Sequence, residues 1–334
     1  MEYVTLGRHG VKVSRLCLGT MMFGGPTNEA DSLEIIDRAC DDGINFVDTA
    51  NVYNDGESER ILGKGIKSRR DKVVLVTKVC GSRGDGINDS GLSRYHIMNE
   101  VENSLKRLGT DYIDIYVLHR AVSDCPIEET LRALDDLVSQ GKVLYPGCSN
   151  FSAHELTEAL WIADKRNYPP MVVLQPLYNI VNRDPEVDLF PACEKFGVGT
   201  MIYSPLARGV LAGKYLVGQP PPDGSRAARK DSRILITELR DESFEVAQAI
   251  VPLADAHGKT MTQFSLNWVL ANPIVTSAII GPRTMAHYED NIGCLGWGIS
   301  DSALDKIDEI VPPGEHTGWG FNDPQYPVTG RPKT

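Results

Sequence analysis

The sequence predicts an α/β protein folded as a closed (β/α)8 barrel, the TIM-barrel architecture. Its 334 residues alternate eight short apolar runs with stretches of helical periodicity, a pattern typical of a parallel sheet. This length and this number of strands suit a barrel. The alternative, an open doubly wound sheet, normally carries a G-x-G-x-x-G run, and this sequence has none. We therefore expect residues 1–334 to form a single domain.

The expected strands are short runs, and all but the first are clearly apolar and β-branched. In chain order they cover residues 15–18, 44–47, 73–77, 113–118, 143–147, 171–174, 197–203 and 275–280. Because the segments between them are long enough for helices, neighbouring strands are expected to run parallel.

Helical patterns fill the intervals between the strands. The first three end at a glycine, which favours the left-handed cap of a helix; they are 28–42 before Gly43, 94–108 before Gly109 and 127–140 before Gly141. Ser152 and Glu155 have capping-box spacing for a helix that starts at Ala153. Later helices are expected at 244–257, 261–270, 287–294 and 302–311.

Two segments depart from this alternation. Residues 209–240 contain three consecutive prolines and many charges, which predicts a long mobile loop inserted after the seventh strand. Residues 312–334 are rich in proline and glycine and carry Trp319, Phe321 and Tyr326. Given these aromatic side chains, we expect the tail to pack across one end of the barrel.

Composition restricts the class of partner and the compartment. The 34 Lys and Arg against 45 Asp and Glu give a formal net charge of −11, which argues against nucleic-acid or anionic-membrane binding as a main role. No secretory signal or membrane-spanning run is recognisable. The seven cysteines are scattered without C-x-x-C spacing, as in a reduced cytoplasmic protein. We expect a cytoplasmic protein with a small-molecule partner, and a homo-oligomer is left open.

Polar side chains follow seven consecutive strands at the end where barrels of this type build their active sites. In order they are Asp48, Lys78, His119, Ser149 with Asn150, Gln175, Tyr203 with Ser204, and Arg283 after Gly281. Each alone has an ordinary structural explanation as a cap, a solvated charge or a satisfied polar group. Their alignment on one rim, with Tyr53 close behind Asp48, indicates a functional site.

Asp48, Tyr53, Lys78 and His119 together suit protonation of a carbonyl oxygen. An ammonium about 4 Å from a phenol is worth roughly 4 kcal/mol at an effective dielectric of 20, or about 3 pK units. Desolvation and Asp48 offset part of this, and we expect Lys78 to lower the pKa of Tyr53 toward a range useful for a general acid. His119 can orient a substrate oxygen. No two histidines have ligand spacing, so no metal site is expected.

These groups move a proton but supply no hydride, so the sequence implies a cofactor. Ser149, Asn150 and Gln175 can hydrogen-bond a carboxamide, and Tyr203 can stack on a flat ring. Phosphate sites in this fold favour the loops after strands seven and eight. Those loops offer backbone groups and cations in a set made up of Ser204, Pro205, Leu206, Arg208, Gly209, Lys214, Gly281 and Arg283, of which Pro205 has no N–H to donate.

Seven stretches at the expected strand ends resemble those of the aldo-keto reductases. They are LGTMMFG at 18–24, NFVDTANVY at 45–53, VTK at 76–78, VLHR at 117–120, GCSN at 147–150, YSPL at 203–206 and GPR at 281–283. The helix start at Pro126 and the loop 206–215 are most similar to the bacterial and fungal branch that includes the potassium-channel β subunits. The resemblance covers nearly the whole chain.

The resemblance implies reduction of aldehydes or ketones with NADPH, with Tyr53 as general acid assisted by Lys78, Asp48 and His119. It implies that Gly19, Thr20 and Met21 line the nicotinamide end of the cofactor. It also assigns the adenosine 2′-phosphate to Arg283, whose guanidinium fork fits a phosphate. In this branch a glutamine usually stands where this chain has His287, ahead of Asp290 and Asn291.

Two other functions fit parts of the pattern. Lys78 at a strand end would form a Schiff base in a class I aldolase, but that reading leaves Arg283, Tyr203 and Asn150 unused. A regulatory subunit that senses the cofactor, of the channel-β type, would keep the same residues with little turnover. Reduction of a generic aldehyde by NADPH discriminates between these functions.

Overall fold

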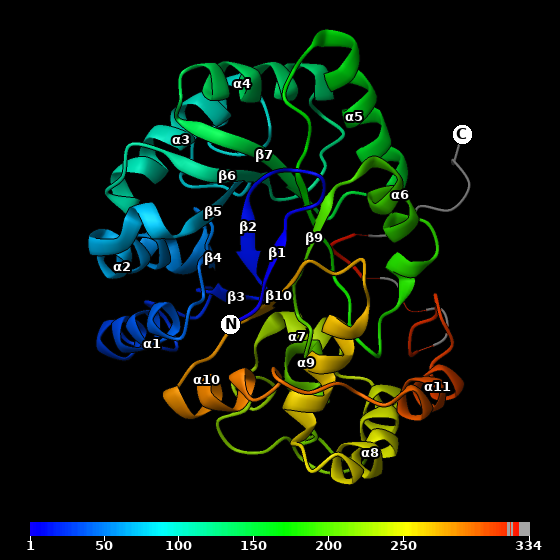
Figure 1. The fold of residues 1–334 in the computed structure, drawn as a ribbon. Coiled ribbons are helices and arrows are strands. Elements are labelled where there is room, and N and C mark those ends of the chain that lie inside the picture. Colours follow the sequence, from blue (N-terminus) through cyan, green and yellow to red (C-terminus); the bar gives the residue numbers. More distant parts are fainter. Residues whose placement is uncertain (319–320, 322, 327–334) are drawn as a thin grey trace. The chain divides into compact units, whose positions relative to one another are not determined.

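The computed structural model describes residues 1–318, 321 and 323–326. Eight parallel strands form a closed barrel in the order β10-β3-β4-β5-β6-β7-β8-β9 (Figure 1). They are β3 (Leu16–Gly19), β4 (Phe46–Asp48), β5 (Val74–Val79), β6 (Ile113–Leu118), β7 (Val143–Ser149), β8 (Val173–Gln175), β9 (Gly199–Ile202) and β10 (Ser277–Ile280). Each predicted strand is present, and the (β/α)8 barrel is confirmed.

Helices surround the barrel, as Figure 1 shows for α1 to α6. They are α1 (Glu29–Asp41), α2 (Glu57–Ile66), α3 (Arg94–Leu108), α4 (Ile127–Ser139), α5 (Ala153–Arg166), α6 (Leu189–Phe196) and α10 (Met285–Ile292). The capping box predicted at Ser152 and Glu155 starts α5, and Gly109 ends α3 in the left-handed conformation with φ 63°. α2 and α6 were not predicted.

An antiparallel hairpin, also not predicted, precedes the barrel. Its strands β1 (Tyr3–Thr5) and β2 (Lys12–Ser14) pair in register. Leu6 and Val13 join the apolar cluster that fills the barrel. Alternate strand residues complete this cluster, because successive side chains of a strand point to opposite faces; they include Cys17, Phe46, Val74, Val76, Ile115, Val117, Val173, Met201 and Ile279.

The chain divides into two compact units. The first comprises Met1–Pro176, Asp188–Tyr203 and Pro273–Asn291 and contains the hairpin and all eight barrel strands. The second comprises Leu177–Val187, Ser204–Asn272 and Ile292–Thr334. Its helices are η3 (Asp184–Glu186), η4 (Ala207–Ala212), α7 (Ser232–Ile236), α8 (Asp241–Ala256), α9 (Met261–Ala271) and α11 (Asp301–Ile310). The single domain therefore stays a prediction.

The predicted insertion at 209–240 is not a loop throughout. Most of η4 lies in it, and α7 begins after Asp231, whose side chain accepts hydrogen bonds from the backbone N–H groups of Arg233 and Ile234. The described part of the 312–334 tail belongs to the second unit. Its packing across the barrel stays a prediction, and Trp319 lies outside the described residues. Among the helices that the structure describes, none is long and apolar enough to cross a membrane.

Candidate active site

The barrel brings the predicted catalytic residues to the carboxyl ends of three adjacent strands. Asp48 is the last residue of β4, Lys78 lies near the end of β5, and His119 follows β6 directly. Tyr53 begins the short helix η1 (Tyr53–Gly56), which leads into α2. These side chains therefore converge because parallel strands end on the same rim.

Lys78 is the centre of this cluster and is completely buried. Its ammonium donates to Asp48 Oδ2 at 2.7 Å, to the Thr49 carbonyl at 2.7 Å and to the Tyr53 hydroxyl at 3.2 Å. The ring of His119 meets the ring of Tyr53 edge-on, with centroids 5.9 Å apart. The four residues named from the sequence thus form one contact group.

The electrostatics of the site correct the expectation that Lys78 lowers the pKa of Tyr53. Burial raises the pKa of the Tyr53 hydroxyl, and the attraction of Lys78 offsets only part of that shift, so the predicted lowering is wrong. Burial also raises the pKa of Asp48 against the effect of Lys78. Burial alone would lower the pKa of Lys78, but Asp48 and Tyr53 reverse this, and its pKa lies above the ordinary value. The site therefore holds a protonated phenol beside a charged ammonium.

His119 is a neutral imidazole. Desolvation, assisted by the positive charges of Lys78 and Arg120, lowers its pKa to about 3. At neutral pH its ring can hydrogen-bond a carbonyl oxygen without adding a charge to a site that already holds the Lys78 ammonium.

This half-buried, desolvated histidine predicts a loss of stability in mild acid. An unfolded chain protonates His119 below about pH 6.5, whereas the folded protein resists protonation until about 3. The folded protein therefore loses stability as the pH is lowered through that window, by roughly 1–2 kcal/mol between pH 7 and pH 5. Urea denaturation at both pH values should show this loss in wild type and a smaller one in His119→Asn. Equal losses in the two proteins would contradict the assignment.

The predicted carboxamide binders form a second group beside the first. Asn150 donates to the His119 carbonyl at 2.9 Å and accepts from the Tyr203 hydroxyl at 2.8 Å. Ser149 donates to the Gln175 carbonyl at 2.8 Å. Gln175 in turn donates its amide to Asp48 Oδ1 at 3.0 Å. The Gln175 contact links this group directly to the Asp48–Lys78 pair, a connection that sequence spacing does not reveal.

The remaining candidates of the first unit lie at β3, β10 and α10. Gly19 pairs with Asp48 in the barrel register, and a Cβ at Gly19 would lie 2.5 Å from Ile279, so this approach requires glycine. Thr20 is buried, and Met21 is 40% exposed. Gly281 and half-buried Arg283 follow β10, and the Arg283 carbonyl accepts from Thr27 at 3.1 Å. His287, Asp290 and Asn291 lie in α10.

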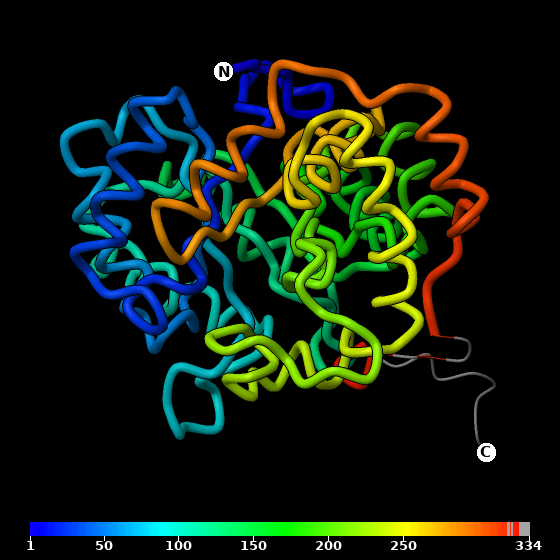
Figure 2. Tube along the Cα trace, turned by 90° about the horizontal axis from the view of Figure 1, so that it is seen from below, coloured from blue at the N-terminus to red at the C-terminus, as the bar shows by residue number. Residues whose placement is uncertain are grey.

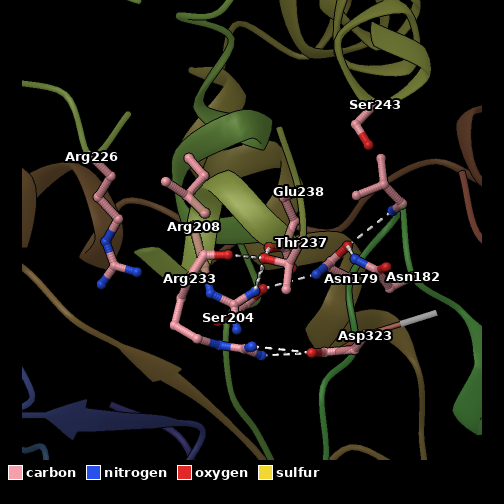
Figure 3. A network of polar contacts seen from close by, with 12 residues as sticks. Asn179, Asn182, Ser204, Arg208, Arg226, Arg233, Thr237, Glu238, Ser243 and Asp323 are labelled. Carbon is pink, nitrogen blue, oxygen red and sulfur yellow. Dashed lines mark hydrogen bonds and ion pairs between the residues drawn. The ribbon is translucent and has the colours of Figure 1, made fainter. Parts of the chain in front are cut away.

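Six predicted cofactor residues belong to the second unit: Ser204, Pro205, Leu206, Arg208, Gly209 and Lys214. Figure 3 shows the polar network around Arg208, whose guanidinium is ion-paired with the carboxylate of buried Glu238 and donates to Thr237 at 3.0 Å. The charge of Arg208 is therefore already compensated, and its role toward a phosphate stays a prediction. The Ser204 carbonyl accepts from Asn179 at 3.0 Å.

The same network fastens the described part of the tail within the second unit. Arg233 of α7 pairs with Asp323 through two hydrogen bonds of 3.1 and 2.6 Å (Figure 3). This bidentate geometry is the strong form of an arginine–carboxylate contact, and it lowers the pKa of Asp323 although burial opposes that shift.

Sequence reasoning missed the residues that support Tyr53. Asn54 donates to two carbonyl groups of the loop after β3, and α2 is anchored by an ion pair between Glu59 and Arg107. The run Asn54-Asp55-Gly56 is a turn signal that indicates a special backbone there. No comparable pattern marks the ion pair, because its partners lie far apart in the chain.

Comparisons with known proteins identify the family of the chain. The model of the Aldo/keto reductase family matches residues 15–312. The chain is 40% identical over 329 residues to YrpG, an uncharacterized oxidoreductase of Bacillus subtilis strain 168, covering 95% of this chain and 98% of the relative. It is 36% identical over 318 residues to a probable voltage-gated potassium channel subunit beta of Arabidopsis thaliana, covering 93% and 97%. A putative subunit of the same kind in Schizosaccharomyces pombe is 37% identical over 320 residues, covering 92% of each chain.

The fold and the match define the class as an oxidoreductase on a (β/α)8 barrel. The chain belongs to the aldo/keto reductase family, whose members generally use NAD(P)H.

Proposed function

We propose that the protein reduces an aldehyde or ketone to an alcohol with NADPH, reversibly, and that its substrate is a small molecule. The observation that carries the proposal is the position of the Lys78 ammonium, within hydrogen-bond distance of both Asp48 and the Tyr53 hydroxyl. In the part of the chain that the structure describes, no cluster of side chains suits a metal ion.

Tyr53 donates its proton to the carbonyl oxygen as negative charge develops there. The phenolate that remains is stabilised by the Lys78 ammonium, whose raised pKa keeps it charged. Asp48 compensates that charge and holds Lys78 in place. Neutral His119, against the Tyr53 ring, hydrogen-bonds the substrate oxygen and fixes its direction.

The polar groups of the rim fit a nicotinamide cofactor. Asn150 and Gln175 carry the amide donors and acceptors that a carboxamide requires, and Tyr203 supplies a ring beside them. When bound, the reduced cofactor supplies the hydride. In this proposal Gly19, Thr20 and Met21 line its nicotinamide end, Arg283 takes the 2′-phosphate, and His287, Asp290 and Asn291 face the adenine. The cofactor roles of Ser204 to Lys214 in the second unit are proposed from the sequence, on the preference of phosphate sites for the loop after the seventh strand and on the resemblance.

The test is oxidation of NADPH by the purified protein over a panel of sugars, steroids, aromatic aldehydes and polyketide ketones. Turnover with at least one carbonyl compound and formation of the matching alcohol are expected. Tight NADPH binding without turnover across the panel would overturn the proposal in favour of a cofactor-sensing subunit. The names of two relatives, both potassium-channel β subunits, favour such a cofactor-sensing subunit as the second candidate function.

Replacement of Arg283 by alanine is expected to weaken NADPH binding about 10- to 150-fold, because a charge-assisted hydrogen bond contributes about 1.5–3 kcal/mol. NADH lacks the 2′-phosphate, so its affinity should change little and serves as the internal control. Fluorescence titration gives both dissociation constants. Equal losses for the two cofactors would remove the 2′-phosphate from Arg283.

The structure disfavours the Schiff-base function. An amine must be neutral to attack a carbonyl, whereas Lys78 is fully buried, donates to three oxygens and has a raised pKa.

We also propose a cytoplasmic protein that binds neither nucleic acid nor membrane, supported by the charge of −11 and by seven cysteines in the thiol form.

A further inference from the structure

The backbone directly after Tyr53 adopts an unusual conformation. Asn54, Asp55 and Gly56 follow one another in the left-handed region, with φ of 46°, 59° and 82°. Two of these three residues are not glycine, so the turn costs free energy that its surroundings must offset. The contacts of the turn therefore determine where Tyr53 lies.

The Asn54 side chain ties this turn to the loop after β3. Its amide nitrogen donates to the carbonyls of Met21 and Phe23, both at 2.8 Å. The loop approaches so closely that a Cβ on Gly25 would lie 2.3 Å from Asn54 Oδ1. Met21 belongs to the proposed nicotinamide wall, so one amide connects that wall to the residue following the general acid.

A second loop also contacts the turn. Arg83, from the loop 81–91 that projects beyond β5 (Figure 2), pairs with Asp55 Oδ1 at 2.6 Å and donates to the Asp55 carbonyl at 3.1 Å. The Arg83 side chain is only 17% exposed although that of Asp55 is 95% exposed. Arg83 thus contacts the turn mainly through a backbone carbonyl and one solvated ion pair.

We infer that Asn54 is a positioning residue, which holds the Tyr53 hydroxyl at its working distance from Lys78 by binding the Met21 and Phe23 carbonyls. The inference rests on the proposed function. The Tyr53–Lys78 contact is already 3.2 Å long, at the outer limit of a normal hydrogen bond. A small movement of the turn breaks it, and a displacement of about 1 Å in an active site can cost about 100-fold in rate.

Asn54→Gly is the informative variant, because glycine adopts the left-handed backbone freely and removes the side chain that makes the two hydrogen bonds. We expect kcat to fall about 10- to 100-fold, with a much smaller change in the dissociation constant of NADPH. Asn54→Asp, which also tolerates this backbone, should act in the same direction because its carboxylate faces two carbonyl oxygens. Asn167→Gly is the matched control, since Asn167 caps α5 with φ 55° and should leave kcat unchanged.

A double-mutant cycle with Tyr53→Phe separates positioning from general weakening of the fold. If Asn54 acts through Tyr53, then Asn54→Gly should remove little of the residual activity of Tyr53→Phe. An equal fold-loss in both backgrounds would overturn the inference, as would an unchanged kcat in Asn54→Gly.

A readout that needs no substrate keeps this inference separate from the proposed function. Ultraviolet difference titration against Tyr53→Phe reports the ionisation of Tyr53 itself. In Asn54→Gly the pKa of Tyr53 should differ from its wild-type value, because a loosened turn changes both the hydration of the hydroxyl and its distance from Lys78, and Asn167→Gly should not change it. A wild-type protein that reduces no carbonyl overturns the proposed function, whereas an unchanged Tyr53 titration overturns the role of Asn54.

Discussion

Tyr53→Phe is expected to lower kcat for carbonyl reduction by about 100- to 10,000-fold, the range that a positioned general acid contributes. The variant loses one oxygen and keeps the ring that contacts His119 and lies near the Lys78 ammonium. Binding of NADPH should stay close to wild type, because the proposed cofactor contacts come from other strands. Stopped-flow hydride transfer together with NADPH titration measures both quantities.

The matched control is Tyr95→Phe, which removes the same oxygen from a side chain that is 65% exposed. Its kcat should equal that of wild type. A Tyr53→Phe protein that retains most of its kcat but loses NADPH affinity would move Tyr53 from proton transfer to cofactor binding. Loss of both quantities together would point to a disturbed rim.

The pH profile gives an independent check on the same residue. Reduction requires the protonated phenol, and burial raises the pKa of Tyr53 above its ordinary value. The group is therefore protonated throughout the neutral range, and kcat for reduction should fall only in strong alkali. A decline that begins near neutral pH and disappears in Tyr53→Phe would show that Lys78 outweighs desolvation after all.

That difference marks a limit of inference from sequence. The attraction between Lys78 and Tyr53 is readable from strand positions, because both residues must reach the same rim. Desolvation depends on how completely the barrel and η1 enclose the hydroxyl, which no spacing reports. Tyr53 is half-buried beside the fully buried Lys78, and the desolvation of its hydroxyl exceeds the attraction of that neighbour.

The secondary structure likewise divides into elements that the sequence pattern predicts and elements that depend on tertiary packing. Buried parallel strands have a strong apolar signal, and all eight barrel strands were predicted, whereas the half-exposed β1–β2 hairpin was not. Helix α2 has two glycines in ten residues, which lowers its intrinsic helix propensity. Tertiary packing explains one of them, since a Cβ on Gly63 would lie 2.1 Å from the Leu108 carbonyl at the end of α3. Glycine here permits two helices to touch, and only the structure reveals that need.

For the site residues, the sequence predicts which side chains lie on the rim better than it predicts the hydrogen-bond or ion-pair partner of each. Gln175 was expected to bind a carboxamide, and its amide donates to Asp48 in the structure. Arg208 was expected to be a cation available to a phosphate, yet it is paired with Glu238. A sequence shows that a polar residue lies on a rim, but its partner is set by side-chain conformations across the fold.

Arg107→Met is expected to destabilise the protein by about 3–5 kcal/mol, the cost of leaving buried charges without a partner. Arg107 pairs with Glu59 and Glu100 at 2.5 Å each. The three side chains are 11%, 0% and 4% exposed, so water cannot replace the guanidinium at Glu59. Urea denaturation at neutral pH gives the free energy of unfolding.

Two comparisons make this prediction specific. Arg60→Met breaks an exposed pair with Glu57, whose partners are each 50% exposed, and should cost less than about 1 kcal/mol. The triple variant Arg107→Met, Glu59→Gln, Glu100→Gln should recover much of the loss, because it leaves neutral groups buried. Failure of the triple variant to recover would mean that packing of the Arg107 side chain, and not charge, supports the helices.

The ion pairs of Arg107 with Glu59 and Glu100 lie close to the proposed catalytic residues, so their loss should affect activity as well as stability. Glu59 lies in the first turns of α2, immediately after the Tyr53–Gly56 turn, and also accepts a hydrogen bond from Thr77 of β5 at 2.6 Å. Thr77 precedes Lys78, so Glu59 holds the segment that carries the general acid against the strand that carries its ammonium partner. Arg107→Met should therefore lower kcat even below its unfolding temperature, whereas Arg60→Met should not. A destabilised Arg107→Met protein with wild-type kcat would confine the network to a purely structural role.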